Sequence, residues 1–196
     1  MVASENGEES TEETEVSSSI VGPFTGYSRA SGFPDPREVP IANVREVLRR
    51  IIEQDGPLTG ASVYRLYVEG CPGLQRVGRT VRQALNRAMR AMLQAGEIVQ
   101  EDELGDRSPE GQVLRVAGTP AVNVRPAERR DLLEITPLEL LAVLRGLAAQ
   151  AQPHDDEILF RKLLDHYGFK RLTRQLREYL SKVVSLFKRD APSRQI

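Results

Sequence analysis

Basic side chains recur at helical spacing in two segments of the chain. The candidate phosphate-contacting residues are Arg76, Arg79, Arg82, Arg87 and Arg90 in the first segment, and Lys170, Arg171, Arg174, Arg177 and Lys182 in the second. At about 100° per residue, the arginines of the first segment fall within an arc of roughly 140° on a helical wheel. Cations along one helix face can neutralise the phosphates of double-stranded DNA. The same pattern also occurs on helix faces that are simply solvated, and both interpretations stay open at this stage.

The opposite side of each segment is apolar, as in a helix that packs on a core. The apolar residues are Val77, Val81, Ala84, Leu85, Ala88, Met89 and Met92 in the first segment, and Leu172, Leu176, Leu180, Val183 and Phe187 in the second. No acidic residue lies between Gly70 and Gly96, and only Glu178 interrupts the second basic face. The spacing therefore predicts amphipathic helices over 79–94 and 172–187.

The two basic segments belong to an internal repeat. Residues 73–85 align without gaps with residues 168–180, and five of the thirteen pairs are identical. Upstream, the pairs Val47/Val143 and Leu48/Leu144 match at an offset of 96 residues. Self-similarity of this kind indicates two related units, each built from three helices.

Additional elements are expected around the basic segments of both units. Apolar spacing after Pro40 predicts a helix that ends at Asp55-Gly56-Pro57, and Val63 to Tyr67 predict a shorter one. Residues 97–100 and 112–116 are short β-type runs. Three helices followed by a hairpin is the order of a winged helix-turn-helix unit.

The second unit is predicted to begin with a capping box. The Thr136 hydroxyl would accept a hydrogen bond from the Glu139 amide, and the Glu139 carboxylate would reach back. The acidic run Asp155-Asp156-Glu157 is interpreted as the N-terminal charge of the next helix. Few residues follow Phe187, so this unit has little chain left for a wing.

The predicted fold is mainly α with a small β-hairpin, arranged as tandem winged helix-turn-helix repeats, the second with little or no wing. The expected divisions are an acidic arm and extended segment at 1–36, unit 1 at 37–118, a linker at 119–134, unit 2 at 135–190 and a tail at 191–196. Residues 1–20 contain mainly Glu, Ser and Thr. Such a composition cannot bury enough apolar surface to offset ordering entropy, so we expect this arm to be disordered.

The formal net charge of −1 conceals two parts of opposite sign. Residues 1–36 carry seven acids and one base, a charge of −6, whereas the remainder carries 26 bases and 21 acids, a charge of +5. The net charge therefore does not exclude an acidic polymer as partner. The hairpin loop would nevertheless repel phosphates, because one base, Arg107, stands against Glu101, Asp102, Glu103, Asp106 and Glu110.

Catalytic, metal-binding and membrane functions find no support in the motifs. Cys71, His154 and His166 lack metal-ligand spacing, so neither a metal nor a cofactor is expected. The chain has no Gly-rich phosphate loop and no nucleophile motif, which predicts that it is not an enzyme. No apolar run approaches the ~20 residues of a membrane helix, the N-terminus is acidic, and one cysteine fits a reducing compartment. The expected location is cytoplasmic.

Several groups of residues resemble one known family. They are Ile51 to Leu58, Arg76 to Val81 leading to Gly96-Glu97-Ile98-Val99, Ile135 to Leu140, and Gly168-Phe169-Lys170-Arg171. In this order, over about residues 24–187, they are similar to the uncharacterised C-terminal domain of large bacterial superfamily-one helicase-like proteins. In those proteins the domain follows a helicase core and a Vsr-like endonuclease domain, often in restriction or phage-defence systems. The resemblance implies a role on nucleic acid beside a helicase or nuclease partner.

Two function classes remain after these exclusions. The first is a non-enzymatic protein that binds double-stranded DNA through two basic third helices, or that positions a helicase or nuclease on it. The second is a protein-interaction scaffold, similar to the tandem winged-helix subunits of bacterial chromosome-condensation complexes. In a scaffold the arginine faces would be solvated and would not touch DNA.

Overall fold

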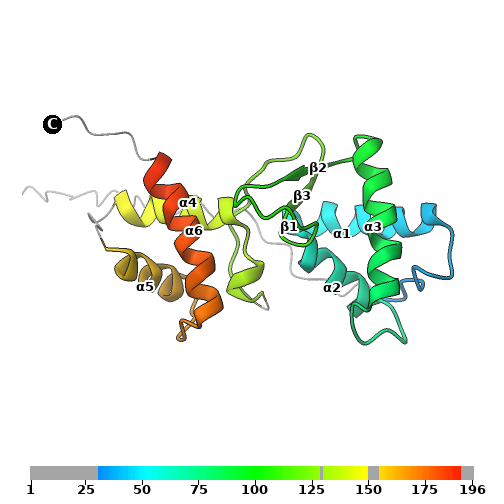
Figure 1. The fold of residues 1–196 in the computed structure, drawn as a ribbon, viewed down its shortest axis with the longest axis horizontal. Coiled ribbons are helices and arrows are strands. Elements are labelled where there is room, and N and C mark those ends of the chain that lie inside the picture. The colour runs from blue at the N-terminus through cyan, green and yellow to red at the C-terminus, as the bar shows by residue number, and fades with distance from the viewer. Residues whose placement is uncertain (1–30, 129, 150–154, 191–196) are drawn as a thin grey trace, which may run out of the picture.

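The computed structural model describes residues 31–128, 130–149 and 155–190, which form a mainly helical structure with one small antiparallel sheet. Figure 1 shows two groups of helices side by side, with the sheet on the inner side of one of them. We call residues 31–118 the N-terminal half and residues 119–190 the C-terminal half. The mainly α fold with a small sheet is confirmed. The predicted arm over 1–30 and the tail at 191–196 lie outside the described residues.

Three helices form the N-terminal half: α1 (Ile41–Asp55), α2 (Gly60–Gly70) and α3 (Arg79–Gln94). The predicted bounds of the first and third are confirmed. Helix α1 stops where the Gly56 amide donates to the Ile52 carbonyl at 2.9 Å, because Pro57, the next residue, has no amide hydrogen to continue the ladder. Helix α2 starts at Thr59, whose hydroxyl accepts from the Ser62 amide at 3.2 Å.

A three-stranded sheet joins these helices. Its strands are β1 (Leu58–Thr59), β2 (Ile98–Glu101) and β3 (Val113–Val116), arranged in the antiparallel order β1-β3-β2. Register places Leu58 opposite Leu114 and Ile98 opposite Val116. The predicted hairpin is confirmed as β2 and β3. Strand β1 was not predicted, because two residues carry no recognisable alternation.

The first hydrophobic core lies between α1, α2, α3 and the sheet. Leu48, Val63, Tyr67 and Leu85 are completely buried in it. Phe33 also belongs to this core, with its ring centroid 5.7 Å from that of Tyr67. The segment that precedes α1 is therefore anchored to the first core.

The C-terminal half contains the short 3-10 helix η1 (Leu132–Glu134) and the helices α4 (Pro137–Ala149), α5 (Asp156–His166) and α6 (Arg174–Asp190). They enclose a second core in which Leu144, Leu159, Leu163 and Leu180 are completely buried. No strand occurs among the described residues of this half. Val124, from the segment predicted as a linker, also packs into this core.

Residues related by the repeat occupy similar environments in the two halves. Leu85 and Leu180 are both completely buried, 95 positions apart, on α3 and α6 respectively. Gly73 and Gly168, at the same offset, both have positive φ, of 89° and 76°. This left-handed conformation favours glycine because it has no Cβ. The same sharp turn therefore leads into the third helix of each half.

The capping box predicted at the start of α4 is only half correct. The Glu139 amide does donate to the Thr136 hydroxyl, at 3.4 Å. The Glu139 carboxylate, however, is buried and accepts from Arg130 at 2.8 and 2.9 Å and from the Arg125 amide at 3.0 Å. An ion pair with a buried guanidinium is stronger than a cap, which explains why the carboxylate turns away.

We expect Glu139→Ala to destabilise the protein strongly, because it removes the carboxylate that accepts two hydrogen bonds from the buried Arg130 guanidinium. Side-chain exposures of 8% for Arg130 and 1% for Glu139 place the pair out of solvent. Removal of one partner of a buried pair costs about 3–5 kcal/mol. Urea unfolding followed by circular dichroism measures the loss.

Arg145→Ala is the control, since it breaks an exposed pair with Asp190 and should cost below ~1 kcal/mol. Equal losses for both variants would contradict the prediction.

Candidate nucleic-acid interface

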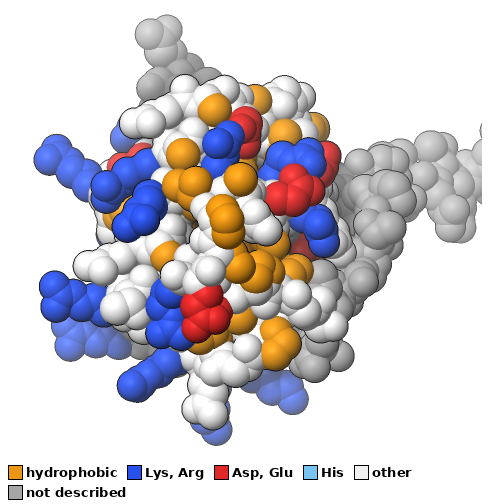
Figure 2. All heavy atoms as spheres, turned by 90° about the vertical axis from the view of Figure 1, so that its right-hand side faces the viewer, with side chains coloured by type: hydrophobic (Ala, Val, Ile, Leu, Met, Phe, Trp, Pro, Cys, Tyr) orange, Lys and Arg blue, Asp and Glu red, His pale blue; other side chains and the backbone are white. Residues whose placement is uncertain are grey.

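Helix α3 presents its cations to solvent because its apolar side is occupied by the first core. Val81, Leu85, Ala88 and Met92 are buried along one side of the helix. All five predicted arginines are exposed: Arg76 in the loop before the helix, and Arg79, Arg82, Arg87 and Arg90 on it. Figure 2 shows the end of the molecule on which α3 lies, where basic side chains gather along one edge beside exposed hydrophobic groups.

Most of the α3 arginines pair with no acidic residue in the described part of the chain. Arg82 is the exception, because its Nε donates to Glu110 of the β2–β3 loop at 2.8 Å. Across the described part of the chain, no ion pair involves Arg76, Arg79, Arg87 or Arg90. Four guanidinium groups on or beside α3 can therefore meet an anionic ligand without first breaking an ion pair.

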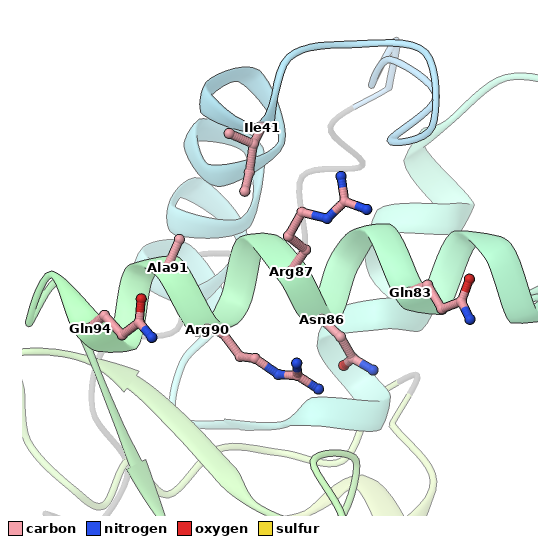
Figure 3. A pocket seen from close by; sticks show the side chains of 7 residues that line it. All are labelled: Ile41, Gln83, Asn86, Arg87, Arg90, Ala91 and Gln94. Atoms are coloured by element: carbon pink, nitrogen blue, oxygen red, sulfur yellow. The ribbon is translucent and has the colours of Figure 1, made fainter.

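A shallow groove of about 510 Å³ runs along the outer side of α3. Its lining consists of Ile41, Gln83, Asn86, Arg87, Arg90, Ala91 and Gln94. In Figure 3, Arg87 lies on the same side of α3 as Ile41 at the start of α1, whereas Arg90 and Asn86 extend to the other side of the helix. Asn86 is held in place, because the Tyr64 hydroxyl donates to its Oδ1. The pattern of cations alone does not predict these amide side chains, although helical spacing places Gln83 and Asn86 on the same face as the arginines.

The basic face of α6 is more strongly neutralised than that of α3. Its predicted residues are all exposed: Lys170 and Arg171 before the helix, and Arg174, Arg177 and Lys182 on it. Arg174 donates to Glu178 at 3.0 Å, Arg177 pairs with Glu157, and Lys188 pairs with Asp156 at 2.5 Å.

The expectation that Glu178 alone interrupts the second basic face is thus wrong. The other two carboxylates come from the start of α5, which packs beside α6. The acidic run lies at the start of α5 as predicted, and Asp155 caps the helix, since its carboxylate accepts from the Glu157 amide at 2.9 Å. Asp156 and Glu157, beyond any effect on the helix dipole, pair with α6. Arg177 also lies 6.0 Å from the centre of the Phe160 ring, which holds its guanidinium close to α5.

The acidic β2–β3 loop is folded onto the protein in several places. Glu110 of the loop pairs with Arg82 of α3, whereas Glu101, predicted in the loop, lies at the end of β2 and pairs with Arg115 of β3 at 2.8 Å. Leu104 packs against the core of the C-terminal half. Asp102, Asp106 and Arg107 remain exposed. The loop therefore connects the two halves and still presents two free acids, which would repel a phosphate backbone.

A second contact joins the two halves. The Arg65 guanidinium of α2 donates to Glu134 of η1 at 2.6 Å, and also pairs with Glu69 at 2.6 Å. Glu134 in addition completes a capping box, in which its carboxylate accepts from the Asp131 amide at 2.9 Å. This side chain thus fixes the start of the C-terminal half and its contact with α2.

Chemistry other than charge complementarity has little support at these surfaces. Cys71 is a buried, free thiol whose pKa is raised by burial, which makes it a weak nucleophile. In the described ranges, no group of three or more His, Cys, Asp and Glu side chains could hold a metal ion. None of the described helices is long and apolar enough to cross a membrane.

No protein-family model, curated protein or solved structure was found to match the chain. The geometry of the two basic helices therefore carries the functional argument.

The Glu103 carboxyl should lower stability at neutral pH. Burial beside the C-terminal half raises its pKa above the ordinary value of 4.5, and the nearby Glu101 and Asp102 charges act in the same direction. A carboxyl whose pKa is higher in the folded protein destabilises the fold when it is ionised. The resulting loss in the free energy of unfolding therefore grows as the pH rises above 4.5. We expect Glu103→Gln to raise the free energy of unfolding at pH 7 but not at pH 4.

Urea unfolding at both pH values measures this difference. Glu38→Gln, which removes an exposed carboxylate, serves as the control. A Glu103→Gln variant that gains the same stability at pH 4 as at pH 7 would show that desolvation of the charge is not the cause.

Proposed function

We propose that this protein is a non-enzymatic tandem winged helix-turn-helix protein that binds double-stranded DNA through the basic faces of α3 and α6. The observation that carries the proposal is the set of four exposed arginines on and before α3 with no ion pair to a described residue. Helix faces of this kind position a protein on the phosphate backbone. The repeat supplies a second such face at equivalent positions of α6.

The element order supports the winged-helix interpretation of unit 1. Helices α1, α2 and α3 are followed by β2 and β3. Strand β1, which lies between α1 and α2 in the sequence, is the third strand of the sheet. Unit 2 repeats the three helices without a strand in its described residues. The third helix of each unit would then be the recognition helix, which lies against the major groove in helix-turn-helix proteins.

The two faces would contribute unequally to binding. On α6, binding of a phosphate by Arg174 or Arg177 requires the loss of a pair with Glu178 or Glu157. The residues before α6, Lys170 and Arg171, are exposed and outside these pairs. We therefore assign the main electrostatic contact to α3 and a weaker backbone contact to the start of α6.

The acidic loop fits a binding mode in which the wing does not touch DNA. Its Glu110 carboxylate pairs with Arg82 of the same half, and Leu104 packs on the other half. The loop then serves as a connection between the units. On DNA, such a protein would position a helicase or nuclease partner, consistent with the family that the sequence resembles.

Affinity for random duplex DNA should fall steeply with salt, because each neutralised phosphate releases condensed counterions. The slope of log affinity against log salt is about −0.9 per phosphate contact. Arg76→Ala and Arg87→Ala should each weaken binding to all sequences and reduce the slope by about one, because both arginines are exposed and pair with no described carboxylate. Fluorescence anisotropy with a labelled duplex, repeated over a range of salt concentrations, measures both quantities.

Arg161→Ala is the matched control for this titration. Arg161 is an exposed arginine on α5 without an ion pair to a described residue, and it lies outside both proposed faces. Its variant should keep the slope of the unaltered protein. Undetectable binding at low salt, or binding indifferent to salt, would refute the phosphate-contact proposal and favour the scaffold.

The acidic arm should compete with DNA for the arginine faces. Residues 1–19 contain six Glu and no Lys or Arg, so they oppose the charge of α3 and α6. We expect deletion of residues 2–19 to increase the affinity for duplex DNA, most clearly at low salt where charges act over longer distances. The same anisotropy titration measures the change. A variant with these glutamates replaced by glutamine separates charge from chain length; unchanged affinity in both variants would contradict the prediction.

A further inference from the structure

Neutral amide side chains lie among the arginines of α3. On a wheel at about 100° per residue, Arg79, Gln83, Asn86 and Arg90 share an arc of roughly 60°. This arc forms a strip on the side of the helix away from the buried residues Leu85 and Met92, with Asn86 half-buried at its edge. The strip is the part of α3 that a helix in the major groove would direct at the bases.

The Asn86 amide is oriented by the protein. The hydroxyl of the buried Tyr64 donates to Asn86 Oδ1, and this leaves the Asn86 Nδ2 group to donate elsewhere. Burial raises the pKa of Tyr64 to about 12, so the hydroxyl keeps its proton at neutral pH and remains a donor. Asn86 lines the groove beside Arg90, and Figure 3 shows both side chains on the same side of the helix.

Amides in this strip serve base recognition better than backbone binding. A neutral amide gains little Coulomb energy from a phosphate, whereas a glutamine such as Gln83 can bond to both N6 and N7 of adenine. The Asn86 Nδ2 group can donate to a base acceptor such as N7 while its Oδ1 accepts from Tyr64. Arginine can bond in the same two-point manner to O6 and N7 of guanine. The combination of Gln83 and Asn86 with Arg79 and Arg90 therefore matches the edges of adenine and guanine.

The repeat provides an internal comparison. At an offset of 95 residues, Gln83 corresponds to Glu178 of α6 and Arg90 corresponds to Ser185. Glu178 accepts a hydrogen bond from Arg174 at 3.0 Å, so the outer strip of α6 contains an internal ion pair where α3 has a free amide. Helix α6 keeps cations for the backbone but lacks the α3 set of base-reading groups.

We propose that α3 confers sequence specificity, reading adenine and guanine in the major groove through Arg79, Gln83, Asn86 and Arg90, while α6 contacts the backbone without reading bases. This inference rests on the proposed function, since it requires that the protein binds duplex DNA. The ligand is a double-stranded DNA site that contains both adenine and guanine within one half-turn to one turn of duplex.

Selection of bound duplexes from a random library by the full chain tests this proposal. We expect the library to converge on a site that contains guanine and adenine. Gln83→Ala should reduce the preference for the selected adenine by roughly tenfold. Its affinity for random duplex, and the salt slope, should be unchanged because the amide carries no charge. Gln175→Ala, which removes an exposed glutamine from α6, should leave the selected site unchanged.

The outcomes separate this inference from the proposed function. Salt-dependent binding of random duplex without an enriched site would overturn base reading by α3 and leave the backbone contact in place. An enriched site that Gln83→Ala leaves intact would do the same. Failure to bind any duplex at low salt would overturn both.

Discussion

Each third helix must bury one apolar side against the two helices before it, and this constraint determines where its cations can lie. On α3 the buried strip contains Leu85 and Met92, and on α6 it contains Leu176 and Leu180. Arginine is costly to bury without a partner, so the basic residues occupy the opposite side. The resulting exposed rows of cations follow from packing, and their relevance to DNA depends on which of them stay unpaired.

The carboxylates near each helix determine which of its cations stay unpaired. On α6, Glu157 reaches Arg177 from α5, and Glu178 pairs with Arg174 within the helix. On α3, among the described residues, only the Glu110 carboxylate pairs with the basic face, at Arg82 on one edge. Exposed pairs of this type contribute little to stability, but each one must be exchanged for a phosphate when DNA binds. Equal numbers of cations on the two helices therefore do not imply equal affinity.

Sequence patterns predicted the parts of the structure that depend on local periodicity. The bounds of α3 and the outward position of its arginines follow from the 3.6-residue repeat, and the β2–β3 hairpin follows from two short apolar runs. Strand β1 could not be predicted, because a strand of two residues shows no alternation of apolar and polar side chains. The Glu139 carboxylate was assigned to a local cap because its real partner, Arg130, depends on how a preceding loop packs.

At the candidate site, too, the features that the sequence did not predict are contacts between residues far apart in the chain. Spacing within α3 could not show that Glu110 would reach Arg82, since 28 positions that include strand β2 separate them in the chain. The link between Tyr64 and Asn86 crosses from α2 to α3 in the same way. Such contacts make the exposed positions of α3 differ from one another. Arg82 is neutralised by Glu110, and the Asn86 amide is held by Tyr64. Arg79 and Arg90 pair with no described carboxylate. Because α6 has a carboxylate where α3 has Gln83, the two repeats present different chemistry on similar helices. The two helices thus carry similar rows of cations and differ in the side chains around them.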